Sequence, residues 1–386
     1  MFSRIRGFVS RNKKKFIVGG MLIAGSGIAI RYAQNRLREY QEKQVKEFLE
    51  KTRRVNHFES TEKTCDQAIS GLLPGLCENI IKLLDTDAIL AELRTNTDNK
   101  LALWEELKIL SFARITALVY ATSLLVTSLR VQLNVIGGYM YKDTISSEAK
   151  ITKEIQTVYN LLLIQHILNN GLTALVNVIR ENVCKIMKKY GLKEKLSLSD
   201  MEQVFWSIQT AIEKDINKNL VQFILPAELP GSHENEVLSK MLSDTLDMLE
   251  SSEFTDICEN SFNSGFSIVI DKIADFYVQK PAPKDKNQLN GKITEIEDNP
   301  EPSSSTKATS ENLLLNESNG MININNIGLP LAKLIPILNG LTTQHPNNNP
   351  ADQKSQKNLA VSLITLQLVN QNIKTMGANV YEVHCK

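Results

Sequence analysis

The chain has 386 residues, 42% of them hydrophobic, and its 44 basic residues nearly cancel its 43 acidic ones. This length and composition allow one large hydrophobic core or two smaller ones. A formal net charge of +1 provides no overall basic field, so no nucleic-acid partner is expected. The first 38 residues, however, hold nine Arg or Lys and no Asp or Glu, which marks the N-terminus as a separate piece.

The five cysteines and five histidines form no pattern that is typical of metal binding or of a disulfide framework. The cysteines are odd in number, widely spaced and without a CxxC pair, as is usual in a reducing compartment. The sequence also lacks a phosphate-binding loop, a GxSxG motif and an HExxH motif. We therefore predict no cofactor, no metal site and no catalytic residues, although scattered residues can still assemble an active site.

A basic tail and an apolar segment open the chain. The tail, residues 1–15, carries a cluster of four basic residues: Arg11, Lys13, Lys14 and Lys15. Residues 16–33 are mostly apolar and rich in glycine, which suits a helix packed in lipid. A cleaved secretory signal peptide is the alternative. Because no small-residue cleavage site precedes Arg31, we predict a permanent transmembrane helix at 16–33.

The next segment, residues 34–58, is highly charged with a thin apolar stripe, and it predicts a helical stalk that continues the membrane helix. A solvated spacer without a further role is the alternative. Ser60 or Thr61 is then expected to cap a second helix, which Pro74 should kink. Residues 59–386 are predicted to form the main helical domain.

The longest predicted helix begins at Lys100 and is expected to end at Gly137 and Gly138, after about 36 residues. Between Arg114 and Arg130 it is apolar on nearly every face, so it must be buried in protein or in a bilayer. This run is shorter than a membrane span, is flanked by arginines and carries hydroxyl groups. We therefore predict the central helix of a protein core.

The first turns of this helix carry Trp104 at the edge of an inward-facing leucine stripe. Trp104 is either a core residue or an aromatic wall of a surface groove. A short helix at about residues 87–94 precedes it, and the polar turn between the two helices brings Leu93 close to Lys100 and Trp104. An amphipathic helix of a partner can lie in such a wedge.

The rest of the chain predicts further helices and no strand. They include a helical hairpin broken at residues 169–171, and a helix with a capping box of Ser199 and Glu202. Residues 280–325 are rich in Pro, Ser and Asn and predict a disordered loop. The fold class is therefore all-α: a single elongated helical bundle around a long central helix, preceded by a transmembrane helix.

Several stretches in one order resemble the peroxin-3 family over almost the whole chain. They are RNKKK (11–15), RRVNHFES (53–60), KLALWEELKILSFAR (100–114), LRVQLNVIGGYMY (129–141), QHILNNGLTALVNVI (165–179), DMLES (247–251) and LPLAKLIPILNG (329–340). The chain departs from the family pattern in residues 142–155, 280–325 and 341–357, which are loops or their flanks.

The resemblance implies a single-pass protein of the peroxisomal membrane, with the N-terminus in the matrix, the large domain in the cytosol and no enzymatic activity. Family members bind the N-terminal amphipathic helix of peroxin-19, the chaperone that delivers peroxisomal membrane proteins as cargo. The groove residues implied by similarity are Leu93, Lys100 and Trp104. By adjacency we add three more: Leu90, Leu101 and Leu107. The cluster from Arg11 to Lys15 resembles the family's membrane-targeting element.

Two other functions stay open at this point. One is an organelle tether that joins the membrane to a motor or to autophagy factors through other faces of the helical domain. The other is a secreted helical enzyme with a cleaved leader, whose mature mass would fall by about 30 residues.

Overall fold

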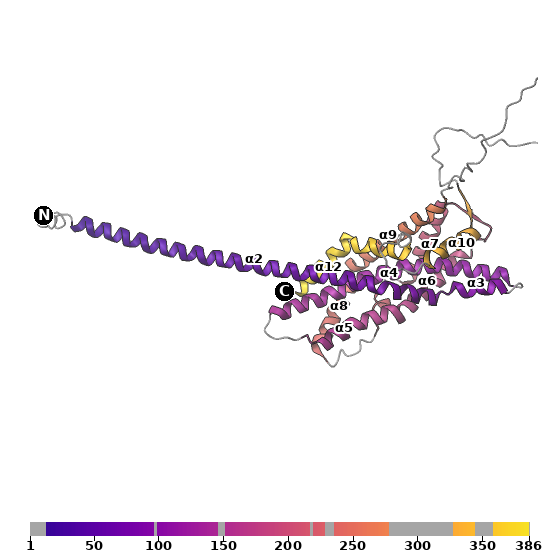
Figure 1. The fold of residues 1–386 in the computed structure, drawn as a ribbon, viewed down its shortest axis with the longest axis horizontal. Helices are drawn as coiled ribbons and strands as arrows, with labels where there is room; N and C mark the ends of the chain where they lie inside the picture. Colours follow the sequence, from indigo (N-terminus) through magenta and orange to yellow (C-terminus); the bar gives the residue numbers. More distant parts are fainter. Residues whose placement is uncertain are drawn as a thin grey trace, which may run out of the picture.

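The computed structural model describes residues 13–95, 99–145, 151–216, 219–227, 235–277, 327–343 and 358–385. These residues form an elongated all-α body, as the sequence predicts, and one long helix projects from it (Figure 1). The predicted loop 280–325 and the basic residue Arg11 lie outside the described residues.

The N-terminal helix α2 (Lys13–Leu83) is 71 residues long and unbroken. The predicted helix start at Ser60 or Thr61 is wrong, because these hydroxyl-bearing residues fit inside the helix. The Thr61 hydroxyl donates a hydrogen bond to the His57 carbonyl, one turn earlier in the same helix, at 3.0 Å. The hydroxyl therefore has a partner inside α2 and does not cap a new helix. The helix also continues through Pro74.

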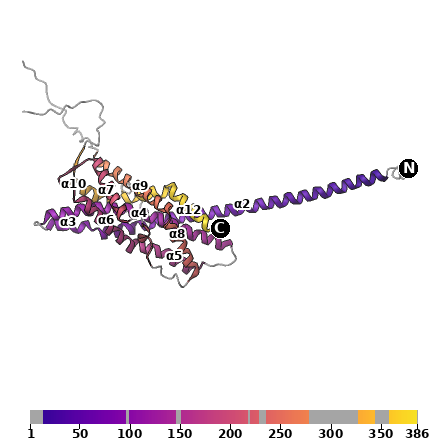
Figure 2. The ribbon, with the colours of Figure 1, turned by 180° about the vertical axis from the view of Figure 1, so that it is seen from behind.

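The described side chains from Ile30 to Arg53 are all exposed, although the Glu50 backbone carbonyl already accepts a hydrogen bond from the Tyr141 hydroxyl of the body at 3.3 Å. Figures 1 and 2 show this exposed part projecting beyond the body toward the N-terminus, while the C-terminus lies where α2 leaves the body. No helix end marks the predicted boundary between stalk and domain at 58, so this boundary stays a prediction. The backbone of residues 16–33 is helical, but most of its side chains lie outside the described residues, so the membrane span stays a prediction.

The central helix α4 (Lys100–Ile145) is the core of the body. It is long and apolar enough to cross a membrane, but 94% of its most apolar window is buried within the protein, as predicted for a core helix. Its buried hydroxyls donate to carbonyls one turn earlier, for example Thr122 to Leu118 at 2.7 Å and Ser123 to Val119 at 2.8 Å. These bonds let polar residues sit in the core.

Gly137 and Gly138 do not end α4, contrary to the sequence expectation. They instead allow neighbouring helices to approach closely. A Cβ atom on Gly137 would lie 2.7 Å from Thr61 of α2, and one on Gly138 would lie 2.7 Å from the His384 Cβ of α12 (Gln371–His384). The glycines thus mark packing sites within α4, and the helix continues past them to Ile145.

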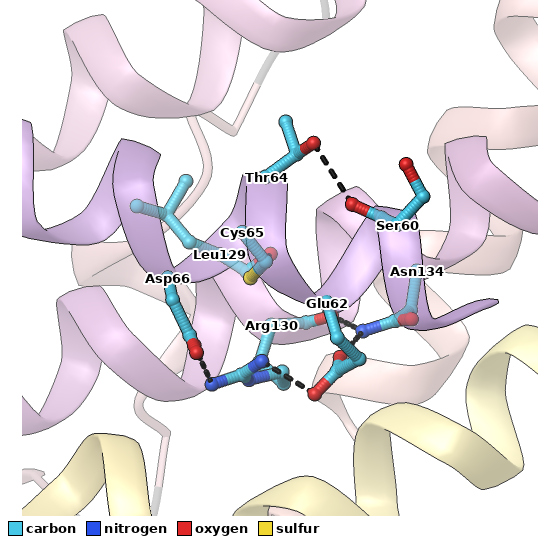
Figure 3. Close-up of polar contacts among 8 residues, drawn as sticks. All are labelled: Ser60, Glu62, Thr64, Cys65, Asp66, Leu129, Arg130 and Asn134. Atoms are coloured by element: carbon cyan, nitrogen blue, oxygen red, sulfur yellow. Dashed lines mark hydrogen bonds and ion pairs between the residues drawn. The ribbon is translucent and has the colours of Figure 1, made fainter. Parts of the chain in front are cut away.

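Arg130 is fully buried, whereas the sequence indicated only an arginine that flanks an apolar run. Its guanidinium donates to Glu62 and to Asp66 of α2, each at 2.7 Å (Figure 3). Asn134 donates to the second oxygen of Glu62 at 3.0 Å. This network fixes the register of α2 on α4.

The predicted hairpin between α5 (Lys153–His166) and α6 (Leu172–Met187) is also wrong, because a π-helical turn, η1 (Ile167–Gly171), joins the two into one helical rod. Gly171 is required there, since a Cβ atom would lie 2.1 Å from the Phe223 carbonyl oxygen. In this rod, which is also long and apolar enough for a membrane span, 39% of the most apolar window is buried.

The remaining elements cover the other faces of α4. They are α3 (Thr86–Thr95), α7 (Leu198–Ile216), η2 (Val221–Phe223), α8 (Glu236–Leu249), α9 (Ser252–Tyr277), α10 (Leu331–Thr343) and α11 (Leu359–Val369). Two short antiparallel strands, β1 (Lys195–Leu196) and β2 (Leu329–Pro330), correct the expectation of no strand. The capping box of α7 consists of Ser197 and Asp200 instead of Ser199 and Glu202.

Candidate partner-binding surface

The candidate site lies on the α3–α4 pair, at the end of the body opposite the projecting part of α2 (Figure 1). We call its six predicted residues the α3–α4 surface: Leu90, Leu93, Lys100, Leu101, Trp104 and Leu107. Helix α3 packs directly on α4. The turn between them, residues 96–98, lies outside the described residues.

Asp85 starts α3 by capping it. Its carboxylate accepts hydrogen bonds from the backbone N–H groups of Asp87 at 2.9 Å and Ala88 at 3.0 Å. A carboxylate at this position satisfies two donors that have no helical partner and complements the helix dipole. The cap lets a helix of only ten residues begin directly after α2.

The α3–α4 surface combines residues of different exposure. Leu90, Leu93 and Trp104 are half-buried, so each presents part of an apolar side chain to solvent. Lys100 is exposed, and Leu101 is 72% exposed although it is a large apolar residue. Leu107 is only 1% exposed and therefore belongs to the core beneath the surface.

Helical geometry separates these residues into two groups on α4. Lys100, Trp104 and Leu107 repeat at intervals of four and three residues, so they share one face, whereas Leu101 lies about 100° away from Lys100. The sequence allowed Trp104 to be either a core residue or the wall of a surface groove. The structure shows it half-buried, so its side chain is partly packed and partly open to solvent. Such a residue can fill a partner's apolar pocket or accept a partner's side chain.

Glu105 and Glu106, the acidic residues next to Trp104, form ion pairs with basic residues of the same protein. Lys108 is 1% exposed and its ammonium group donates to Glu105 at 2.5 Å and to the Tyr190 carbonyl at 2.8 Å. Arg180 of α6 pairs with Glu106 at 2.5 Å. These contacts hold the first turns of α4 against α6, so Trp104 stands on a fixed helix.

Sequence reasoning missed a cavity of about 780 Å³ at the other end of α4. Tyr139 donates there to Asp244 at 2.5 Å, and His384 Nδ1 lies 3.5 Å from the same carboxylate oxygen. Burial lowers the pKa of His384. No motif marked this place, because its residues come from α4, α8 and α12 and meet only in the fold.

The described residues contain no group of three or more His, Cys, Asp and Glu side chains that could hold a metal ion. Burial also raises the pKa of the thiols of Cys65, Cys77 and Cys258 to about 12, so these cysteines are poor nucleophiles.

Fold and surface together define an all-α protein, built on one buried helix, that displays half-buried apolar residues at the tip farthest from its N-terminus. The Peroxin-3 family model matches residues 7–102, 94–163 and 161–381. The chain belongs to the peroxin-3 family.

Two curated relatives support this assignment over nearly the full length, and a third supports it over part of the chain. Peroxisomal biogenesis factor 3 of Mus musculus is 34% identical over 397 residues, which cover 97% of this chain and 95% of the relative. The Homo sapiens protein of the same name is 33% identical over 405 residues, with 99% and 97% covered. A peroxisomal membrane protein of Komagataella phaffii is 26% identical over 198 residues, with 41% and 44% covered. The chain therefore has a role in peroxisome biogenesis and a location at the peroxisomal membrane.

Proposed function

We propose that this chain is a docking receptor for peroxin-19 and has no catalytic activity. It binds the N-terminal amphipathic helix of peroxin-19 at the α3–α4 surface and brings the attached membrane-protein cargo to the peroxisome. One observation carries the proposal: the half-buried Trp104 of α4 and two half-buried leucines of α3 flank the junction of two helices that pack on each other. Apolar anchors of a partner helix recur every three or four residues and fit such a junction.

Trp104 is expected to supply most of the binding energy. A tryptophan at the centre of an interface typically contributes about 2 kcal/mol or more, which corresponds to roughly thirtyfold in affinity. Lys100, being exposed, is expected to steer an acidic partner and to contribute less energy. Leu107 acts from below by supporting the surface.

The test is a titration of the full chain in detergent micelles with the N-terminal helix of peroxin-19. We expect Trp104→Ala to weaken binding roughly thirtyfold with unchanged helical content in circular dichroism. Trp206, which is 62% exposed on α7, provides a matched control, and Trp206→Ala should bind as the native chain does. Absence of binding by the native chain would contradict the receptor function, and equal loss in both variants would contradict the site.

The proposal includes an orientation. The basic residues from Arg11 to Lys15 direct the chain to the membrane, residues 16–33 span it, and the body lies in the cytosol. In support, the described side chains from 34 to 53 are all exposed, as expected for a stalk in water. Protease added to intact peroxisomes should then remove the body, whereas a protected body would exclude this orientation.

A tether function is a second candidate, because large apolar and aromatic residues are exposed on other faces of the body. Trp206 is 62% exposed on α7 and Phe276 is 49% exposed on α9. A tether requires no contribution from Trp104. Peroxin-19 binding that survives Trp104→Ala would therefore shift the assignment toward this function.

A further inference from the structure

Helix α3 packs on α4 but buries only one of its residues completely. Thr86, its first residue, is the one fully buried residue among the ten of this helix. A helix of this length is not stable by itself in water, so tertiary contacts must hold it. The half-buried Leu90 and Leu93 lie one and two turns further along, where any tilt of α3 would move them relative to Trp104.

A buried polar cluster holds α3 at Thr86. The Thr86 hydroxyl donates to the side-chain oxygen of Asn339 at 2.8 Å. Arg114 of α4 is fully buried and donates to the same oxygen at 2.9 Å. Its guanidinium also donates twice to the Leu84 carbonyl, at 2.6 and 3.2 Å, at the end of α2. The Asn339 side chain of α10 thus joins α3 to α4, and Arg114 joins α4 to the residue that follows α2.

We propose that Thr86, Arg114 and Asn339, here named the Asn339 bracket, are positioning residues that orient α3 and thereby set the affinity for the partner helix. This inference rests on the proposed receptor function. A partner cannot contact Thr86 or Arg114, because neither has exposed surface, whereas Asn339 is half-buried. Their role is to keep Leu90 and Leu93 at a fixed distance from Trp104, so that the partner meets a preorganised surface.

The bracket also links distant parts of the chain. Asn339 lies 253 residues after Thr86 in sequence. On helix α10, Asn339 is half-buried and lies at the edge of a face on which Leu334, Ile335 and Leu338 are fully buried. The C-terminal part of the protein therefore controls a surface made entirely from residues of the first third.

The principal test uses Thr86→Val, which removes the hydroxyl and keeps the shape. Native-state hydrogen exchange of the full chain in detergent micelles reports the position of α3 without any partner. We expect the amides of 88–95 to exchange at least about threefold faster, while those of α4 and α12 keep their rates. Affinity for the peroxin-19 helix should fall about three- to tenfold.

Three further variants sharpen the result. Thr95→Val changes the same residue type at the exposed end of α3 and should leave exchange and affinity unchanged. Asn339→Leu removes the shared acceptor and should reproduce the Thr86→Val phenotype. Asn339→Asp keeps an acceptor for Thr86 and Arg114, so it should restore both measurements toward native values.

The outcomes separate the bracket from the receptor function. Native exchange rates for α3 in Thr86→Val would overturn the bracket even if the native chain binds peroxin-19. Faster exchange with unchanged affinity would overturn its positioning role. A native chain that fails to bind at all would overturn the proposed function, while faster exchange in Thr86→Val would still show that the bracket holds α3.

Discussion

Glu62 and Asp66 bind the same buried guanidinium but differ in their access to water. The side chain of Glu62 is 17% exposed and that of Asp66 is 42% exposed, while Arg130 has no exposure. Removing Glu62, the more buried carboxylate, leaves the buried guanidinium of Arg130 with only one of its two acidic partners. The two carboxylates therefore contribute unequally to the free energy of unfolding, although both lie 2.7 Å from Arg130.

We predict that Glu62→Ala lowers the free energy of unfolding by about 3 kcal/mol. Asp66→Ala should cost under about 1 kcal/mol, because water screens the more exposed carboxylate. Urea denaturation of both variants checks the order. Glu39→Ala, which removes a pair whose side chains are about 70% exposed, serves as the control and should have no measurable effect. Equal losses for Glu62 and Asp66 would contradict this ranking.

Residue roles were only partly visible in the sequence. The peroxin-3 resemblance pointed to Trp104, and the structure gives that residue a half-buried position. The burial of Arg114 and Arg130 was not predictable, because their partners are contributed by residues far away in the chain, such as Asn339 and Glu62. Long-range pairing of this kind leaves no local signal.

At the scale of elements, helix types were predictable and helix ends were not. The central helix and its burial follow from its apolar character and charge pattern. The wrong boundaries fell on residues that commonly mark helix ends: Ser60, as a cap at a helix start, and Gly137, Gly138 and Gly171, as helix breakers. Tertiary packing overrides these local signals, since each of the three glycines lies where a neighbouring segment comes too close for a side chain.

This interpretation predicts opposite effects for two helical glycines. Gly138→Ala should destabilise the protein by about 1 to 3 kcal/mol, because the new Cβ would lie 2.7 Å from His384 and 3.0 Å from backbone atoms of α12. Gly75→Ala, in α2, meets nothing within 4 Å and should stabilise it by about 0.5 to 1 kcal/mol. Thermal or urea unfolding compares them. A stabilising Gly138→Ala would show that α4 and α12 are not closely packed there.

At the scale of the whole molecule, the proposed membrane span and the proposed docking surface lie toward opposite ends (Figure 2). Helix α2 leads from the N-terminus to the body, and α3 lies at the opposite tip (Figure 2). The 71 residues of α2 have a length of roughly 107 Å. The exposed part of this helix separates the N-terminus from the body. In the proposed orientation, peroxin-19 would therefore dock far from the bilayer.

The most direct test of this account is hydrogen exchange of the full chain in detergent micelles, with and without the N-terminal helix of peroxin-19. The account predicts slower exchange in α3 and in the first two turns of α4, residues 86–107, and no change near the cavity of Tyr139 and His384. Protection confined to that cavity, or no protection anywhere, would contradict the central claim that the α3–α4 surface binds peroxin-19.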